Sequence, residues 1–566
     1  MEKVELNNYL AKYPRNLKLK SLLMRKLLTF FAGTLITGSV LAGGLVTNTN
    51  QSAMFTRLQN RNASTGIDAV YYNPAGLTRL GDGFYVSINN QTIGQTKTVG
   101  NNYAYLSGTN GGTTSRDFVG KVSAPLFPGV YVAYNAGKVS FSAGFNPIGG
   151  GGGAKYDKGL PSFEAMVADL VPLLASQSIP TTLYSADIFF EGSSVYFGYQ
   201  ANVGYKINDM LSLAAGMRLV SAANSYKGHL RNININPNYP AFGAAYTGGM
   251  VLASDFFTSG ATFLTGLATS SISAATGLTT AINGGVPATT PLSAMPPGTV
   301  AGVTQLLGAA GISAVGMNIG TAAATLNAIA PGFTAKATSM TSNAASTQNI
   351  EVDASQSGMG YTPIISANFS PSEKLNIAVK YEFKTKLELT TKVKNNMGGG
   401  IFTDGTKVIA DMPAMLAVGA EYKPIDNLMV SASMNYYFDK NVDYDGSASL
   451  NINMIDKNFV EYGLGLEYAF STELRASAGW VATSTGVNSN YQNEQEYSTN
   501  TNSFGAGFGY RITSMIDLNI GGQYTFYKKG SKDFNHMLGT NPILLTETYA
   551  KKTWLVAVGL DFYFGK

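Results

Sequence analysis

The chain lacks cysteine altogether and has little histidine, tryptophan or charge. Its 566 residues include no Cys, 2 His and 2 Trp, and only 13% of them are charged. The missing thiols exclude a disulfide scaffold and a thiolate metal site. Two histidines in predicted loops or strand ends disfavour a zinc site or a histidine-based triad, so we expect no metal, no cofactor and no enzyme activity. The net charge of +5 is spread along the chain, which disfavours nucleic acid as a partner.

Uncharged polar and aromatic residues take the place of the missing charge. The chain has 64 Gly, 32 Tyr and 29 Phe, while its apolar fraction of 45% is ordinary. This mixture favours strands with one apolar face and one uncharged polar face. The aromatic content also argues against disorder.

Residues 24–42 have the pattern of a signal peptide. Arg25 and Lys26 form a basic start, Leu27–Val40 is apolar, and Val40-Leu41-Ala42 offers a cleavage site. We therefore expect residues 1–42 to be an N-terminal extension plus a signal peptide, with Met24 as a candidate start. A membrane-anchoring helix is the alternative, because the apolar run reaches about 20 residues when it is extended to Val46.

A two-residue hydrophobic period runs through the rest of the chain. It is sustained over 375–389, 460–470, 516–526 and 554–564. Soluble strands average about five or six residues, whereas a tilted strand needs about 9–11 to cross a bilayer. The opposite face carries Gly and charged residues, which suits a polar lumen.

Short and long connections alternate between these strands. Short connections with turn chemistry fall at 135–138, 206–210, 370–374, 423–427, 471–473 and 513–514. Long connections fall near 99–125, 149–190, 231–350, 392–411, 441–458, 487–500 and 529–551. The fold class predicted is all-β: a transmembrane antiparallel β-barrel of about 14 strands, with long extracellular loops that contain some helix. A soluble β-sandwich or propeller is the alternative.

Residues 43–82 lack the strand period and carry the first of three family motifs. Asn73-Pro74-Ala75 follows Ala63-Ser64-Thr65-Gly66 and Asp68-Ala69, Met412-Pro413 opens a segment that reaches Gly419, and Trp554 and Gly559 precede the terminal aromatics. With these motifs in this order, the mature chain resembles the outer-membrane long-chain fatty acid transporters, the FadL-like family that includes aromatic-hydrocarbon uptake proteins. It departs from the family by ending Phe564-Gly565-Lys566 and by its very long 231–350 loop.

The resemblance implies an organisation and a function. Residues 43–82 would be a hatch inside the lumen, with Asn73, Pro74 and Ala75 as its motif, and 83–566 would be the barrel with the 231–350 insertion. Hydrophobic molecules, foremost long-chain fatty acids, would be captured outside, enter an apolar pocket and leave passively through a gap in the third strand. The location implied is the outer membrane of a Gram-negative bacterium, as a multi-pass monomer that contacts lipid, lipopolysaccharide and the barrel-insertion machinery.

The third predicted strand ends in residues that suit such a gap. Pro147 lacks a ladder N–H, and a glycine run follows it. The candidate gap residues are Asn146, Pro147, Gly149, Gly150 and Gly151. The alternative is that the strand ends here and a glycine loop begins.

Candidate ligand contacts lie in the long loops and on the fifth strand. Phe163, Met166 and Leu170 form a helix-like apolar stripe. Phe256 and Phe257 lie in the nearly uncharged 231–350 loop, where self-packing, lipopolysaccharide contact and filler are alternatives to ligand capture.

A carboxylate ligand would want a cation at the pocket. By resemblance the family's basic pocket residue falls at Gly228, with Lys227 beside it, and a solvated rim lysine is the alternative reading of Lys227. If no cation faces the pocket, a neutral hydrophobic substrate is favoured. A general diffusion porin and a structural or adhesive surface protein are the alternative functions.

Overall fold

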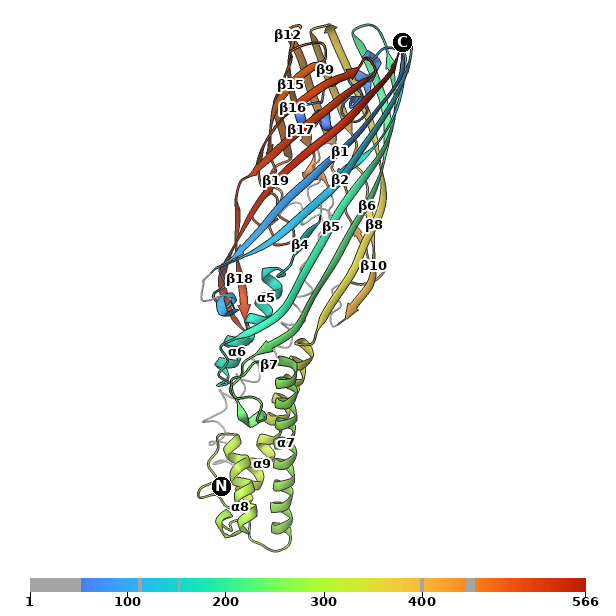
Figure 1. Cartoon of the computed structure of the whole chain (residues 1–566). Helices are drawn as coiled ribbons and strands as arrows, with labels where there is room; N and C mark the ends of the chain where they lie inside the picture. The colour runs from blue at the N-terminus through green and yellow to red at the C-terminus, as the bar shows by residue number, and fades with distance from the viewer. Residues whose placement is uncertain (1–51, 110–114, 151–152, 398–401, 443–453, 566) are drawn as a thin grey trace.

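The structure is a computed structural model that describes residues 52–109, 115–150, 153–397, 402–442 and 454–565. It confirms the predicted antiparallel barrel, whose wall contains fourteen strands among these residues (Figure 1). The wall strands are β1 (Gly83–Asn101), β2 (Arg116–Ala136), β3 (Val139–Gly149), β5 (Tyr184–Lys206), β6 (Leu211–Ile235), β8 (Ile350–Ser372), β9 (Leu375–Glu382), β12 (Met415–Ile425), β13 (Leu428–Tyr437), β14 (Phe459–Ala469), β15 (Leu474–Ser484), β16 (Thr501–Thr513), β17 (Ile516–Tyr527) and β19 (Asn541–Gly565).

Each wall strand pairs with its neighbours along the chain, and the first pairs with the last. The β1–β19 ladder runs from Gly83↔Gly565 to Asn101↔Glu547 and closes the sheet. The predicted short connections join the strands at one end of the barrel, here called the short-turn end, and the long connections lie at the other, the long-loop end. Short strands are added at or near the long-loop end: β4 (Ala154–Tyr156), β7 (Val251–Leu252), β10 (Glu388–Met397), β11 (Lys407–Ile409) and β18 (Gly530–Leu538).

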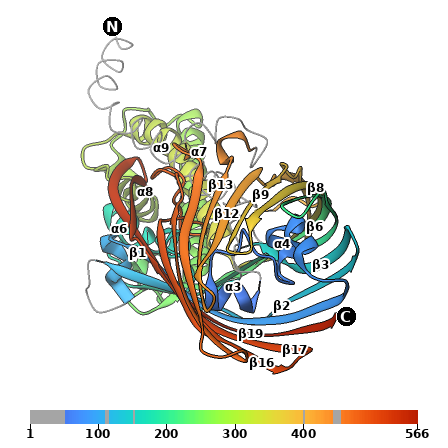
Figure 2. The same ribbon diagram turned by 90° about the horizontal axis from the view of Figure 1, so that it is seen from above.

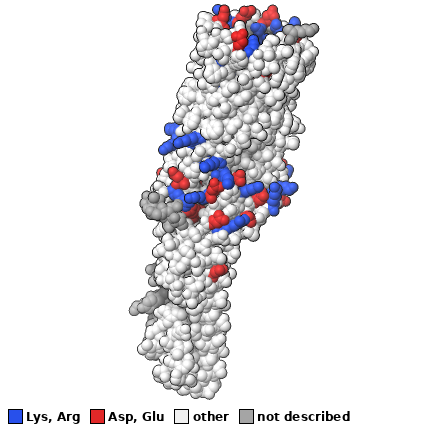
Figure 3. Space-filling view, in the orientation of Figure 1, with Lys and Arg blue, Asp and Glu red and all other residues white. Residues whose placement is uncertain are grey.

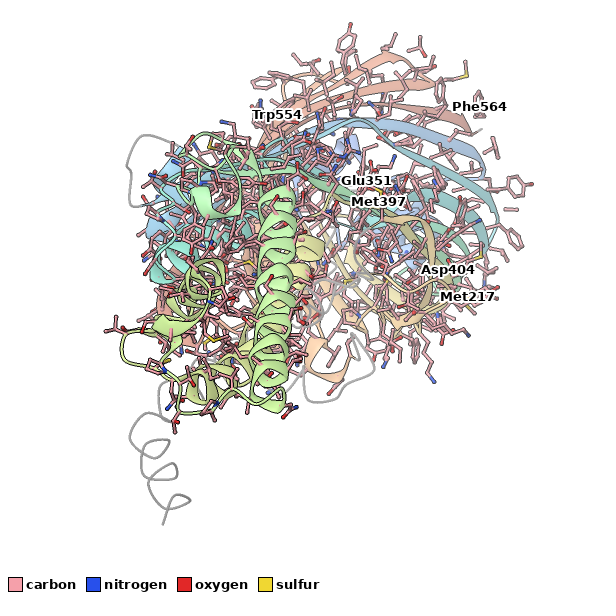
Figure 4. The ribbon with its side chains drawn as sticks, turned by 90° about the horizontal axis from the view of Figure 1, so that it is seen from below. Met217, Glu351, Met397, Asp404, Trp554 and Phe564 are labelled. Atoms are coloured by element: carbon pink, nitrogen blue, oxygen red, sulfur yellow. The ribbon has the colours of Figure 1, made fainter. Side chains whose placement is uncertain are left out.

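The outer surface of the barrel has an apolar belt. On β19 the outward Trp554, Val556 and Val558 are each about half exposed, whereas Leu555 and Ala557 between them are buried. Figure 4 shows Met217, Trp554 and Phe564 on the periphery of the barrel. On the face seen in Figure 3, charged side chains gather at the short-turn rim and in a band near the long loops, with an uncharged surface between them. This pattern matches a wall that faces lipid.

Helices occur in the lumen and among the long loops. They are α3 (Ala53–Leu58), α4 (Ala69–Tyr72), η1 (Pro74–Arg79), η2 (Ala104–Thr109), α5 (Pro161–Ala168), α6 (Leu170–Ser176), η3 (Pro240–Phe242), α7 (Ala253–Asn283), η4 (Leu292–Ala294), α8 (Pro297–Ala309), α9 (Ile319–Ser346) and η5 (Asp439–Asn441). No described helix is long and apolar enough to cross a membrane.

Helices α7, α8 and α9 form an arm that projects from the long-loop end (Figure 1). The outer part of the arm has its own apolar core, which includes Leu278, Leu307 and Leu326. Its base packs through Phe256 and Phe333 into a second cluster that continues into the barrel mouth at Leu230. The arm is therefore a self-packed extension of the 231–350 connection.

The N-terminal segment, residues 52–82, lies within the ring of strands, as α3 and α4 in Figure 2 show. Inward-facing glycines of the wall allow this close approach. A Cβ at Gly505 would lie 2.4 Å from the Thr56 carbonyl oxygen, and one at Gly419 would lie 2.6 Å from the Ala63 nitrogen. The predicted signal peptide (1–42) and residues 43–51 of the predicted hatch lie outside the described residues.

Candidate functional site

Arg57 joins the N-terminal segment to the last strands of the barrel. Its side chain is completely buried. The guanidinium donates to Asn519 Oδ1 at 2.9 Å and also to Glu467 and Ser477. Buried charges are stable only when they are paired and hydrogen-bonded. These contacts therefore hold α3 against β14, β15 and β17.

A second buried arginine organises the middle of the same segment. Arg61 Nε donates to Asp68 Oδ2 at 2.8 Å and Arg61 Nη1 donates to Glu421 Oε1 at 3.0 Å. The Ser64 hydroxyl donates to Asp68 Oδ1 at 2.5 Å. The small-residue stretch at 63–69 is thus a folded turn around an ion pair, and Arg61 also binds the wall strand β12.

The Asn-Pro-Ala motif makes the next contacts with the wall. Asn73 Nδ2 donates to Asn368 Oδ1 at 2.7 Å and to the Ser64 carbonyl oxygen at 3.0 Å. The Ala75 N–H donates to Ser366 Oγ at 3.0 Å. Pro74 opens η1, where its fixed φ and missing N–H are tolerated. The motif residues therefore attach the segment to β8.

The wall contains a segment in which two neighbouring strands are not paired. Pairing of β2 with β3 ends at Val130↔Phe145. Among the described residues, the next pair on that side of β2 is Lys121↔Lys155, with β4. Through β1, the residues 122–129 between these pairs are level with Thr553–Gly559 of β19, which carry the apolar belt. The interruption therefore lies at the level of the apolar belt.

The predicted gap residues line one edge of this interruption. Asn146, Pro147 and Gly149 pair with β5 only, and the register shifts between Pro147 and Gly149. Gly150 has φ +88°, and a Cβ there would lie 2.3 Å from the Ser194 carbonyl oxygen, so the chain presses against β5 at this point. Gly151 lies outside the described residues.

The opposite edge carries two prolines that sequence reasoning missed. Pro125 and Pro128 lie within β2, where each removes a ladder N–H donor. Unsatisfied donors are costly at a sheet edge in lipid, and proline lowers their number. A pair of prolines three residues apart was the available signal, but Pro125 was the last residue of the predicted long connection 99–125 and Pro128 lay just beyond it.

A bulge gives this edge its shape. The β1–β2 register shifts between Gln91 and Ile93, opposite Pro125. Thr92 Oγ1 donates to the Pro125 carbonyl oxygen at 3.0 Å, and the Phe127 N–H donates to Asn90 Oδ1 at 3.0 Å. Side chains of β1 thus satisfy backbone groups that the bulge leaves without a ladder partner.

A cavity of about 650 Å³ lies at the long-loop end of the barrel. Much of its wall is apolar, formed by residues from α5, β5, β6, β8, β18 and β19 that include Phe163, Met166, Phe190, Leu230, Ile350, Phe534 and Leu545. Of the predicted ligand contacts, Phe163, Met166 and Lys227 border the cavity. Leu170, Phe256 and Phe257 are buried in the adjoining apolar cluster and do not line it.

Lys227 is placed at the rim. Its side chain is exposed, and its cross-strand neighbours are Glu191 and Asp353, so two acidic residues flank it. Gly228, which aligns with the family's basic position, has no side chain to offer. Neither residue presents a buried cation to the cavity.

Polar residues from four of the long connections, together with residues of β19, meet near the cavity. Asp169 accepts from the Tyr103 hydroxyl at 2.5 Å and lies 2.9 Å from His536 Nε2. Glu547 accepts from Tyr549 Oη at 2.8 Å. Glu494, in the loop between β15 and β16, accepts from the Ser162 N–H at 2.9 Å, and burial, with the charge of Glu547, raises its pKa to about 7.

Two lysines that sequence reasoning did not single out face the lumen beyond the cavity. Lys97 of β1 and Lys551 of β19 are directly opposite each other across the closing seam. Gln95 and Thr553 are the next lumen-facing pair on the side away from the cavity, and Gln95 Nε2 donates to Thr553 Oγ1 at 2.8 Å. The pairing of the first strand with the last brings these lysines together, and no local sequence pattern signals it.

No protein-family model and no curated protein matches the chain. Among solved structures, a Pseudomonas aeruginosa FadL homologue superposes with a TM-score of 0.54 at 12% identity, over 92% of this chain and 100% of that chain. The P. putida toluene transporter TodX gives 0.45 at 12% identity over 89% and 95% of the chains, and the Ralstonia pickettii toluene transporter TbuX gives 0.42 at 15% over 88% and 94%. The protein thus has the fold of the FadL homologue.

Proposed function

We propose that this protein passively transports hydrophobic molecules across the outer membrane of a Gram-negative bacterium. The unpaired segment between β2 and β3 is the observation that carries the proposal. It interrupts the wall at the level of the apolar belt, where a closed sheet would otherwise satisfy every backbone group. An opening at that level leads sideways into lipid and not into water.

The three parts of the site form a route in this scheme. Molecules enter the largely apolar cavity at the long-loop end, pass along the lumen beside the N-terminal segment, and leave between β2 and β3. Each CH₂ group kept away from water saves about 0.8 kcal/mol. A lateral exit therefore suits an alkyl chain better than a water-filled pore, and no energy source is required.

The lumen argues against the alternative of a general diffusion porin. A porin needs an open aqueous bore, whereas Arg57, Arg61 and Asn73 attach residues 52–82 to opposite parts of the inner wall. We propose that residues 43–82 act as a hatch that blocks small polar solutes. Long-chain fatty acids are the proposed substrates, with neutral hydrocarbons as the alternative.

A reversible cross-link across the interruption tests the exit. Because the chain contains no Cys, introduced cysteines have no native thiol with which to form a competing disulfide. If the β2–β3 ladder continued beyond Val130↔Phe145, Pro128 would be opposite Pro147. Pro128→Cys with Pro147→Cys should therefore close part of the gap, and Val132→Cys with Ala143→Cys, in the paired ladder, is the matched control.

Uptake is measured with labelled oleate and labelled oleyl alcohol in a host that lacks its own hydrophobe channel. We expect oxidation, or a short bis-maleimide, to lower the uptake of both probes in the P128C/P147C variant. Reduction should restore uptake in the disulfide form, and the control pair should transport normally in both states. Normal uptake by P128C/P147C that mass spectrometry shows to be cross-linked would refute lateral exit.

A further inference from the structure

The lumen-facing lysines Lys97 and Lys551 are an unusual pair. They are directly opposite in the antiparallel β1–β19 ladder, where like charges destabilise a sheet. Val99 and Tyr549, the next inward pair toward the cavity, are fully buried. The two ammonium groups, each half-buried, are thus brought together next to a fully buried pair.

The surroundings provide direct contacts for Lys551 and none for Lys97 among the described residues. Lys551 Nζ lies 4.4 Å from the centre of the Tyr497 ring and donates to the Tyr497 carbonyl oxygen. Lys97 makes neither a hydrogen bond nor an ion pair with the part of the chain that the structure describes. Glu496 is the nearby acid, but it accepts from the Tyr491 hydroxyl at 3.0 Å and forms no ion pair with either lysine there.

The Tyr156 hydroxyl, near Lys97, likewise lacks a hydrogen-bond partner among the described residues. The Tyr156 ring occupies the space over Gly120, the cross-strand neighbour of Lys97 on β2, where a Cβ would lie 2.4 Å from Tyr156 Cζ. Tyr156 is 2% exposed, and its hydroxyl has no hydrogen-bond partner among the described residues. A buried hydroxyl without a partner is costly, so it marks a place where a ligand atom would be stabilised.

Lys97 and Lys551 lie on the proposed route. Asn101, Glu547 and Tyr549 of the same two strands border the cavity on one side of the lysines. On the other side, Gln95 is paired with Val122, the first residue of the unpaired segment of β2. A molecule that moves from the cavity to the wall interruption therefore passes Lys97 and Lys551.

We propose that Lys97 and Lys551, with the Tyr156 hydroxyl, bind the carboxylate head group of an amphiphile whose alkyl chain occupies the apolar part of the route. This inference rests on the proposed transport function. A carboxylate offers about four acceptor positions, enough for two ammonium groups and one hydroxyl. It would neutralise the repulsion between the lysines, which a neutral hydrocarbon would leave in place.

Binding of two probes to the purified full-length protein in detergent tests the proposal. The probes are labelled oleate and labelled oleyl alcohol, which share a chain and differ in the head group. Lys97→Met and Lys551→Met remove the charge and keep the apolar stem, and Lys97→Arg restores a cation. The matched control is Lys552→Met, because Lys552 is the exposed, outward-facing neighbour of Lys551.

We expect each lumen variant to weaken oleate binding about tenfold or more, since hydrogen bonds to charged groups are the stronger ones. Oleyl alcohol should bind within about twofold of the wild type, Lys97→Arg should recover most of the loss, and K552M should match the wild type. Unchanged oleate binding in correctly folded K97M and K551M, or an equal loss for both probes, would overturn the carboxylate site. Failure of the wild type to bind either probe would instead refute the proposed function.

Discussion

Replacing Arg57 by methionine tests how strongly the N-terminal segment is held in the lumen. Arg57→Met keeps an unbranched apolar side chain and removes the charge and the hydrogen bonds to Asn519, Glu467 and Ser477. Glu467 then loses its cation. Because its side chain is 18% exposed, part of its charge can be rehydrated.

The magnitude follows from that environment. Removing one partner of a buried ion pair costs about 3–5 kcal/mol. The partial exposure of Glu467 places the expected loss near the lower end, at about 3 kcal/mol, which is roughly a 150-fold change in the equilibrium between the attached and detached segment. The effect should be on attachment of the segment and not on barrel insertion, since no hydrogen bond between wall strands is lost.

Conductance in planar bilayers is the assay. We expect the fraction of time for which the channel is open to be roughly 150-fold larger in R57M than in the wild type. The heat-modifiable migration of the barrel on a gel should stay normal. Arg79→Met is the control, because Arg79 belongs to the same segment but is exposed and donates only to the Asp209 carbonyl oxygen among the described contacts. Adding Glu467→Gln to R57M should recover part of the loss. A channel as closed in R57M as in R79M would refute the anchoring role of the ion pair.

Three other expected outcomes concern the loops, the arm and the belt. Because the pKa of Glu494 is raised from 4.5 to about 7 in the folded protein, the unfolded chain loses this proton at lower pH. The contribution of Glu494 to stability therefore declines as the pH rises from about 4.5 to 7. Glu494→Gln should flatten the fall in unfolding temperature over that range. Replacing 270–329 by a short Gly/Ser turn should leave the barrel folded and heat-modifiable, because the outer core of the arm shares no fully buried residue with the cluster at its base. In W480F, brominated lipid should quench the fluorescence of the outward Trp554 strongly.

Each of these outcomes has a result that would contradict it. An unfolding profile of E494Q that keeps the wild-type slope would mean that other groups set the pH dependence. Loss of heat-modifiable migration on removal of 270–329 would show that the outer arm supports the barrel. Quenching of Trp554 only by a water-soluble quencher, with iodide as the comparison, would place the belt outside lipid.

The strand architecture could be predicted because its determinants are local. The two-residue period and turn chemistry at positions such as 135–138 and 513–514 depend on a few adjacent residues, and the structure places turns there. The long connections were less well delimited. Strand β2 already begins at Arg116, inside a stretch assigned to a loop, and the 529–551 stretch contains β18 and the start of β19.

The site was harder to predict because it depends on register between distant strands. A shift of one residue reverses the direction of a side chain, so the sequence alone does not decide whether position 227 or 228 faces the pocket. The pairing of Lys97 with Lys551 exists only because the first and last strands close the barrel. The interruption of the wall likewise depends on which residues of β2 and β3 stop pairing, although prolines and glycines mark its edges.

The attachment of residues 52–82 imposes an order on biogenesis. This stretch leaves the ribosome before any wall strand, yet Arg57 binds residues of β14, β15 and β17, which are synthesised near the end. The seam between β1 and β19 can be completed only after the final strand is available. Residues 52–82 therefore lack the contacts of Arg57 until the last strands are added, and the closing wall then encloses them. A chaperone that shields residues 52–82 would act in the interval before the barrel closes around them.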